Sequence, residues 1–177
     1  MATTEDGAVF DGRAFRVRVD ERRSPDGRTR RYEIVERVPA VAVVVDVQGA
    51  LLAIRQERPA VGRVLYELPA GKVDPGEDAE VAARRELAEE TGYRAGRLSH
   101  LFDPYPSPGY TSEVVSFFWT ANPEAGVPRR EPGEEAAGME VLLLSPQQVR
   151  QILEDSTPLN ALFHTGATAW LARHPLA

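Results

Sequence analysis

Two stretches near the start of the chain alternate between apolar and polar residues, which is the pattern of strands with one buried face. Residues 14–22 place Phe15, Val17 and Val19 on one side, and residues 29–38 repeat the alternation. The Ser-Pro-Asp-Gly sequence at 24–27 lies between them and is a strong turn signal. The pattern therefore predicts a β-hairpin, preceded by a polar segment, residues 1–12, that we expect to be frayed.

A hairpin of this size is only marginally stable by itself, so it must pack against the rest of the chain or against a second copy. Pro39 marks the boundary to the remainder of the sequence, which has a different pattern. We therefore predict an N-terminal β-hairpin annex at residues 1–38 and a main domain at residues 39–177.

The main domain begins with an almost wholly apolar run, which is typical of a strand that is buried on both faces. Further strands, loops and helices are predicted from periodicity, turn residues and caps. A mixed sheet with helices on both faces gives an α+β fold, built as an α/β/α sandwich. The predicted strands are 40–47, 50–55, 64–68, 98–102, 113–120 and 139–144, the loops are 56–62 and 122–138, and the helices are 79–90, one from Pro146 and about 159–173.

Charge and composition narrow the possible functions. The 177 residues carry a formal net charge of −6, and an acidic surface disfavours non-specific binding to nucleic acid. The absence of cysteine excludes disulfides and thiolate metal sites. No apolar run approaches the ~20 residues that span a bilayer, and the N-terminus lacks the features of a signal peptide. We therefore expect a cytoplasmic protein with no nucleic-acid or membrane partner.

Three carboxylates gather near the end of the predicted helix at 79–90. Glu86, Glu89 and Glu90 share one helical face, where their mutual repulsion and the helix dipole both oppose them. A divalent cation would reverse that effect, because hard cations prefer several carboxylate oxygens. The residue types favour a metal site, and a solvated acidic face is the alternative.

The same stretch carries a long motif. Gly71 is followed after five residues by Glu77, and after seven more by Arg-Glu-Leu-Ala-Glu-Glu-Thr-Gly-Tyr at 85–93. This spacing resembles the signature of the Nudix hydrolases, with Tyr93 at a position that is most often aliphatic. The resemblance implies an α/β/α sandwich and hydrolysis of a nucleoside diphosphate linked to another group, with Mg²⁺ or Mn²⁺ as cofactor.

The resemblance also implies roles for individual residues of the motif. Glu86 and Glu90 would be the principal metal ligands, together with the backbone carbonyl of Ala70. Glu89 would ligate or position a further metal ion or a water molecule. Arg85 would orient the glutamates through charge-assisted hydrogen bonds, and the alternative for it is a surface cation.

Other segments are similar to the ADP-ribose pyrophosphatases. The sequence Ser-Pro-Gly-Tyr-Thr-Ser-Glu at 107–113 resembles a substrate-loop motif of that subfamily, and three further segments add to the likeness. They are residues 31–35, 55–62 and 67–71. Some of these motifs are shared with GDP-mannose hydrolases, so the hydrolysis of another nucleotide sugar is the alternative.

This second resemblance implies substrate-binding residues. Tyr32 would stack on the adenine, Glu33 would bind its amino group, and Arg58 would meet the diphosphate or the terminal ribose. Pro108 would shape the substrate loop, and Glu113 would contact the terminal ribose or a metal ion. The alternatives are a hairpin core position for Tyr32, a surface cation for Arg58 and a solvent-facing strand residue for Glu113.

The general base and the assembly follow from the same resemblance. In this subfamily the base comes from a loop before the last strand, which favours Glu135 here, then Glu134; a solvated loop position is the alternative for both. The resemblance implies hydrolysis of ADP-ribose to AMP and ribose 5-phosphate by a homodimer, in which the annex of one subunit completes the adenine site of the other. A non-catalytic nucleotide-sensing module is the alternative from another class, and the intact motif disfavours it.

Overall fold

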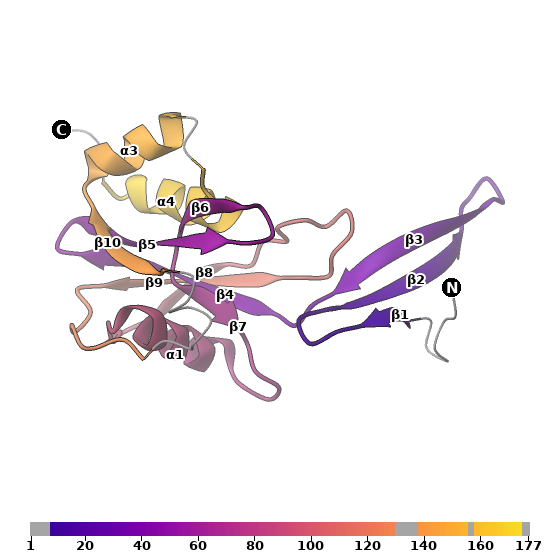
Figure 1. Cartoon of the computed structure of the whole chain (residues 1–177), viewed down its shortest axis with the longest axis horizontal. Helices are drawn as coiled ribbons and strands as arrows, with labels where there is room; N and C mark the ends of the chain where they lie inside the picture. The colour runs from indigo at the N-terminus through magenta and orange to yellow at the C-terminus, as the bar shows by residue number, and fades with distance from the viewer. Residues whose placement is uncertain (1–7, 130–137, 156–157, 175–177) are drawn as a thin grey trace.

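The computed structural model describes residues 8–129, 138–155 and 158–174. Within these ranges the chain forms a three-stranded sheet, a seven-stranded sheet and the helices α1, α3 and α4 (Figure 1). The strands are β1 (Ala8–Asp11), β2 (Arg16–Arg23), β3 (Thr29–Glu36), β4 (Ala40–Val47), β5 (Ala50–Arg58), β6 (Arg63–Glu67), β7 (Ala70–Lys72), β8 (Ser99–Phe102), β9 (Val115–Ala121) and β10 (Glu140–Leu144), and the helices are α1 (Ala79–Thr91), α3 (Pro146–Glu154) and α4 (Ala161–Leu171).

The annex is a three-stranded antiparallel sheet in the order β1-β2-β3. Strands β2 and β3 form the predicted hairpin, with Val17 opposite Val35 in the ladder. Part of the segment that the sequence predicted to be frayed is instead strand β1, and that prediction is wrong for residues 8–11. The reason is non-local: Ala8 and Phe10 pair with β2, and this pairing buries Ala8.

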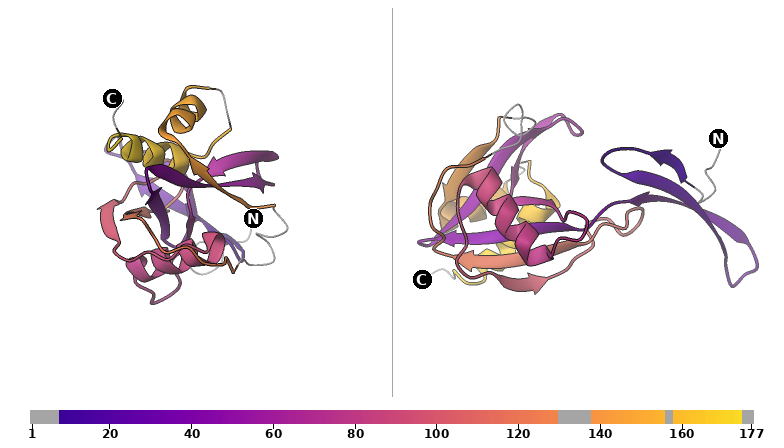
Figure 2. Two further views of the ribbon diagram at one scale, coloured as in Figure 1. Left: turned by 90° about the vertical axis from the view of Figure 1, so that its left-hand side faces the viewer. Right: turned by 90° about the horizontal axis from the view of Figure 1, so that it is seen from below.

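The annex projects from one end of the main domain, as Figures 1 and 2 show from different sides. It is held there by the loop that precedes β9. Val35 donates its backbone N–H to the Tyr110 carbonyl at 2.8 Å and accepts from the Ser112 N–H at 3.1 Å. An ion pair between Arg37 and Glu113 at 3.1 Å adds to this junction.

The large sheet has the order β10-β5-β4-β9-β8, and β6 and β7 pair with β5 and β4. Strands β4 and β9 are parallel and the other pairs are antiparallel, so the sheet is mixed. Alternate residues of β4 face opposite layers: Val41, Val43 and Val45 pack with α1, whereas Ala42 and Val44 pack with α3 and α4. Because helices cover both faces (Figure 1), the predicted α/β/α sandwich is confirmed.

The sheet opens between β4 and β5. These strands pair only beside their connecting turn, at Asp46–Val47 and Ala50–Leu51. Farther along, the start of β4 pairs with β7, whereas the end of β5 pairs with β6. The predicted loop at 56–62 is therefore partly strand, because the ladder with β6 continues through Arg58. This divergence leaves room for a cleft between the two strands.

The ends of α1 are fixed by caps. The Asp78 side chain accepts from the Glu80 N–H at 2.8 Å, and Gly92 ends the helix in the left-handed conformation. The loop after β9 lies close to this end, since a Cβ on Gly92 would come within 2.7 Å of the Gly126 carbonyl oxygen. The Arg129 N–H also donates to the Glu89 carbonyl at 2.8 Å, so residues 122–129 are anchored to the last turn of α1.

Helices in the described part of the chain fall short of the length and apolar character that crossing a membrane requires.

Candidate active site

A cavity of about 400 Å³ opens where β4 and β5 diverge. Its walls come from the end of β5, from β7 and from the inner face of α1. It brings together six of the residues that the sequence singled out, namely Ala70, Arg58, Arg85, Glu86, Glu89 and Glu90. The other described residues of the lining are Gly71, the first residue of the motif, and five residues to which sequence reasoning gave no role in the site, namely Arg13, Gln56, Lys72, Asp74 and Met139.

Two carboxylates of the cavity are almost withdrawn from solvent. Glu86 is 9% exposed and Glu90 is 4% exposed. Glu90 accepts a hydrogen bond from the Ala70 N–H at 3.0 Å, which fixes it against the start of β7. The sequence predicted a role for the carbonyl of Ala70, whereas its amide is the group that contacts Glu90.

Gly71 allows Glu86 to approach the backbone of β7. A Cβ at residue 71 would lie 2.0 Å from the carboxyl carbon of Glu86 and 2.1 Å from its Oε1. Real side chains do not tolerate such distances, so only glycine leaves space for the carboxylate here. Gly71, the first fixed residue of the motif, thus makes room for the carboxylate of Glu86, which comes fifteen residues later in the chain.

Arg85 connects the carboxylates. Its guanidinium binds Glu77 through Nε at 3.0 Å and Nη2 at 2.9 Å, and its Nη1 donates to Glu86 at 2.8 Å and to Glu89 at 3.2 Å. The Nη2 group also donates to the Lys72 carbonyl. This arrangement leaves each carboxylate with a defined orientation rather than a range of rotamers.

These contacts shift the pKa of both main partners. The guanidinium of Arg85, assisted by the Asp74 N–H, lowers the pKa of Glu77 to about 2. In turn the carboxylates, Glu77 first, raise the pKa of Arg85 above its ordinary value. Glu77 is therefore ionised and Arg85 is cationic at neutral pH, and their pairing is charge-assisted.

The donor set suits a small hard cation. Among the described residues, no three acidic or histidine side chains stand in a geometry that would hold a metal ion by themselves. Glu86 and Glu89 face Arg85, and Glu90 faces the Ala70 amide. Magnesium is usually held by one or two carboxylates together with water and substrate phosphates. Two buried carboxylates and the space at Gly71 fit that kind of site.

Arg58 enters the cavity from the end of β5. Its guanidinium forms a bidentate ion pair with the carboxylate of Glu67, in which Nε donates to one oxygen at 2.7 Å and Nη2 donates to the other. Glu67 is 3% exposed and also accepts from the Gln56 amide at 3.3 Å. Arg58 is therefore held in position by this ion pair, although its side chain is 46% exposed. Sequence reasoning missed Glu67 as its partner, and the residue spacing of nine gave no local signal for it.

Four other predicted substrate residues lie away from this cavity. Tyr32 and Glu33 lie on β3 in the annex, where Tyr32 is 44% exposed and so is not a core residue. Glu113 pairs with Arg37 and lines a separate cavity of about 280 Å³ at the junction with the annex. Pro108 lines neither cavity.

The two candidates for the general base, Glu134 and Glu135, lie outside the described residues.

Comparison with known proteins places these features in a family. The profile described as "NUDIX domain" matches residues 35–164. The "ADP-ribose pyrophosphatase" of Bacillus subtilis (strain 168) is 33% identical over 147 residues, which cover 82% of this chain and 79% of that protein. The "ADP-sugar pyrophosphatase" of Mus musculus is 31% identical over 159 residues, 80% of this chain and 72% of that protein. The "Methanol dehydrogenase activator" of Bacillus methanolicus is 36% identical over 111 residues, 62% of this chain and 60% of that protein.

Proposed function

Because the chain belongs to the Nudix family and is a hydrolase similar to ADP-ribose pyrophosphatases, we propose that it hydrolyses the diphosphate of ADP-ribose to AMP and ribose 5-phosphate. Water attacks one of the two phosphorus atoms, and the bond to the bridging oxygen breaks. The observation that carries the proposal is the cavity in which buried carboxylates lie beside positioned guanidinium groups. Such a mixture of charges suits a dianionic diphosphate that enters together with a cation.

Mg²⁺, with Mn²⁺ as a possible substitute, is the cofactor that we propose for this cavity. Glu86 and Glu90 would hold it, and Glu89 and the Ala70 carbonyl are the further candidate ligands. When bound, the cation neutralises charge on the diphosphate and activates water for attack on phosphorus. Buried carboxylates at Gly71 supply the hard oxygens that such a cation prefers.

The protein side chains then bind, orient and accept protons. Arg58, held by Glu67, binds the diphosphate or the terminal ribose. Arg85 keeps Glu86 and Glu89 in position through the hydrogen bonds given above. Glu135 is the proposed general base that takes a proton from the attacking water, and Glu134 is the second candidate.

The adenine end is proposed to bind between subunits of a homodimer. Tyr32 and Glu33 lie on the projecting annex and outside the carboxylate cavity of their own chain. A second copy could bring them to that cavity, with Pro108 and Glu113 in the loop beside the annex. Sedimentation of the full chain tests this proposal, and a monomer at the concentration of the assay contradicts it.

Charge-neutralising variants test the catalytic proposal. We expect Glu90→Gln and Glu86→Gln to abolish turnover of ADP-ribose almost completely, while both proteins stay folded. Glu80→Gln is the matched control, since Glu80 lies on the same helix and pairs with Arg84 outside the cavity. Unchanged kcat in both cavity variants contradicts the assignment of the site.

Substrate choice needs a panel of nucleotide sugars. We expect kcat/KM to be highest for ADP-ribose. A higher kcat/KM for GDP-mannose would identify GDP-mannose as the preferred substrate instead. Product analysis in heavy-oxygen water then shows which phosphorus is attacked, because the label appears on only one of the two products. Nucleotide binding without any turnover would favour a sensing module instead.

A further inference from the structure

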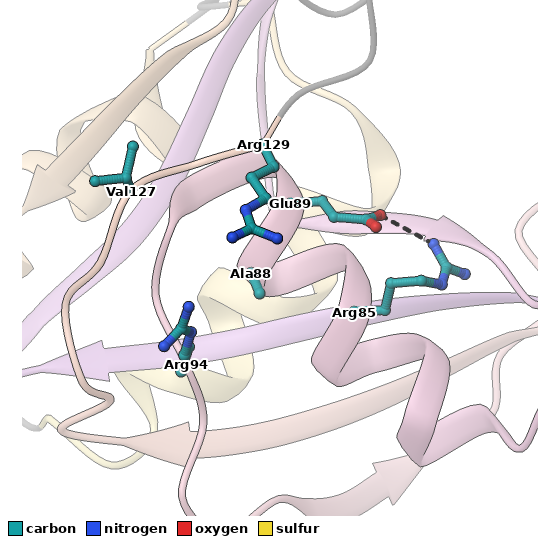
Figure 3. A pocket seen from close by; sticks show the side chains of 6 residues that line it. All are labelled: Arg85, Ala88, Glu89, Arg94, Val127 and Arg129. Carbon is teal, nitrogen blue, oxygen red and sulfur yellow. Dashed lines mark hydrogen bonds and ion pairs between the residues drawn. The ribbon is translucent and has the colours of Figure 1, made fainter.

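A second, smaller cavity adjoins the active site. It has a volume of about 210 Å³ and lies beside the last turn of α1. Arg85 and Glu89 line both cavities, so these two ion-paired side chains form the wall that the cavities share. The other described residues that line it are Ala88, Arg94, Val127 and Arg129, and Figure 3 shows the guanidinium groups of Arg94 and Arg129 directed into the space over Ala88.

The charges in this cavity are unbalanced. Among the described residues, three guanidinium groups line it with one carboxylate, that of Glu89, which is turned toward Arg85 at 3.2 Å. The guanidinium groups of Arg94 and Arg129 make no hydrogen bond or ion pair with any residue in the described ranges. In a chain with a net charge of −6, two neighbouring arginines that no described carboxylate pairs with favour an anionic ligand.

The backbone holds both arginines in place. Residues Arg94 and Glu124 exchange backbone hydrogen bonds at 2.8 and 2.9 Å, which ties the segment after α1 to the loop after β9. The Arg129 N–H is bonded to the Glu89 carbonyl, and the close approach of Gly92 and Gly126 fixes the same contact. The cavity therefore lies on anchored backbone, even though the two side chains themselves are exposed.

Stabilisation of the helix end does not account for the two side chains. Cations are favourable near a helix C-terminus, but the terminal carbonyls here are met by backbone groups. The Gly92 N–H donates to Ala88, and the Arg129 N–H donates to Glu89. The guanidinium groups make none of these bonds, so they remain available to a ligand.

We propose that Arg94 and Arg129 form a binding site for a phosphate group, separate from the cavity that holds the diphosphate. Guanidinium groups match phosphate oxygens in geometry and charge. The volume of about 210 Å³ lies below the roughly 300–1,000 Å³ of ordinary small-molecule sites, so the site takes a small phosphate group and not a whole nucleotide. The phosphate comes from inorganic phosphate or from a phosphomonoester. Because Glu89 lies between the two cavities, occupation of this site acts on the electrostatics of the active site.

Titration with inorganic phosphate tests the site directly. The full-length protein, free of metal, is titrated while its backbone amide signals are followed by NMR. The amides of Arg94 and Arg129 are expected to shift most, and those of Gly71 and Lys72 in the larger cavity are expected to shift much less. Arg94→Gln and Arg129→Gln are each expected to weaken phosphate binding about tenfold, the scale of one lost charge-assisted hydrogen bond.

Two controls locate the anion. Arg97→Gln removes an exposed arginine close in sequence that lines neither cavity, and it should leave the affinity within about twofold of wild type. If the phosphate binds beside Arg94, Arg58→Gln should also leave the phosphate affinity within about twofold of wild type. A large loss of phosphate affinity in Arg58→Gln places the phosphate in the larger cavity and overturns the proposal. Wild-type affinity in both test variants, or no binding to the wild-type protein, also overturns it.

A parallel titration identifies the source of the phosphate. Ribose 5-phosphate that binds more tightly than inorganic phosphate, with the same dependence on Arg94 and Arg129, identifies a phosphomonoester. Tighter binding of inorganic phosphate identifies the free anion. Because these titrations use no metal ion and no ADP-ribose, they test phosphate binding at this site independently of whether the protein hydrolyses ADP-ribose.

Discussion

Replacing Gly71 with alanine changes the position of one carboxylate and little else. The φ angle of Gly71 lies outside the left-handed region, so alanine can adopt the same backbone. The pairing of residue 71 with Val41 uses backbone groups and is retained. The new Cβ, however, would lie 2.0 Å from the carboxyl carbon of Glu86, and contacts under 3.0 Å essentially never occur. The carboxylate must therefore move by at least about 1 Å.

The size of the effect follows from what this movement breaks. A misplacement of about 1 Å at a catalytic group can cost about 100-fold in rate, and we expect a loss of that order in kcat. The folding free energy should change little. The Glu86 carboxylate is the terminal group of a flexible side chain, and losing its bond to Arg85 costs about 1 kcal/mol. The loss of backbone freedom in the unfolded chain offsets roughly 0.4–1 kcal/mol of this.

The assay separates activity from stability. Hydrolysis of ADP-ribose is measured with saturating Mg²⁺, the free energy of unfolding is measured with urea, and the rise in Tm on addition of Mg²⁺ reports cation binding. Gly96→Ala is the matched control, because a Cβ there meets no atom within 4 Å and the φ angle is also ordinary. The control should match wild type in all three measurements.

A clear result would refute the reasoning. If Gly71→Ala keeps kcat within about threefold of wild type and shows the same Mg²⁺-dependent rise in Tm, the contact between Gly71 and Glu86 does not matter for function. Loss of activity together with a large loss of stability would also count against it, because the reasoning requires a folded protein with a displaced carboxylate.

Two further predictions concern the charged partners in the cavity. The folded state lowers the pKa of Glu77 from 4.5 to about 2, so the stability that its pairing with Arg85 provides is present above pH 4.5 and is lost as the pH falls toward 2. The difference in unfolding free energy between wild type and Glu77→Gln should therefore shrink over that range, and a difference that stays constant down to about pH 3 would disprove the pairing. Glu67→Gln leaves Arg58 without its carboxylate and should raise the KM for ADP-ribose about tenfold with a smaller change in kcat, whereas an unchanged KM would show that Glu67 does not position Arg58.

Local signals predicted much of the framework. The apolar run at 40–47 is a central strand because a strand covered on both faces is mostly apolar, and its alternate side chains enter the two cores. The helix at 79–90 was predicted to within one residue, because strong helix formers lie between a capping aspartate and Gly92. In both cases the signal comes from neighbours in sequence, so it can be read without knowing the fold.

Other features depended on pairing between distant segments. Strand β1 was not predicted, since its few residues gain order only by pairing with β2. The end of β5 was predicted as a loop because its residues are charged, yet the ladder with β6 continues to Arg58. Polar sequence is compatible with a strand when a neighbouring strand supplies its hydrogen bonds.

The sequence by itself determined that Glu86, Glu89 and Glu90 share one helical face, because a helical turn places carboxylates three and four residues apart on one side whatever the rest of the chain does. Only the tertiary structure decided what these carboxylates touch. The register of β7 on β4 brings Gly71 against Glu86 and the Ala70 amide to Glu90. The packing of residues 122–129 on the end of α1 places Arg129 near Arg94. Such contacts join segments far apart in the chain, and their distances are set by sheet register and packing rather than by the spacing of residues in the sequence.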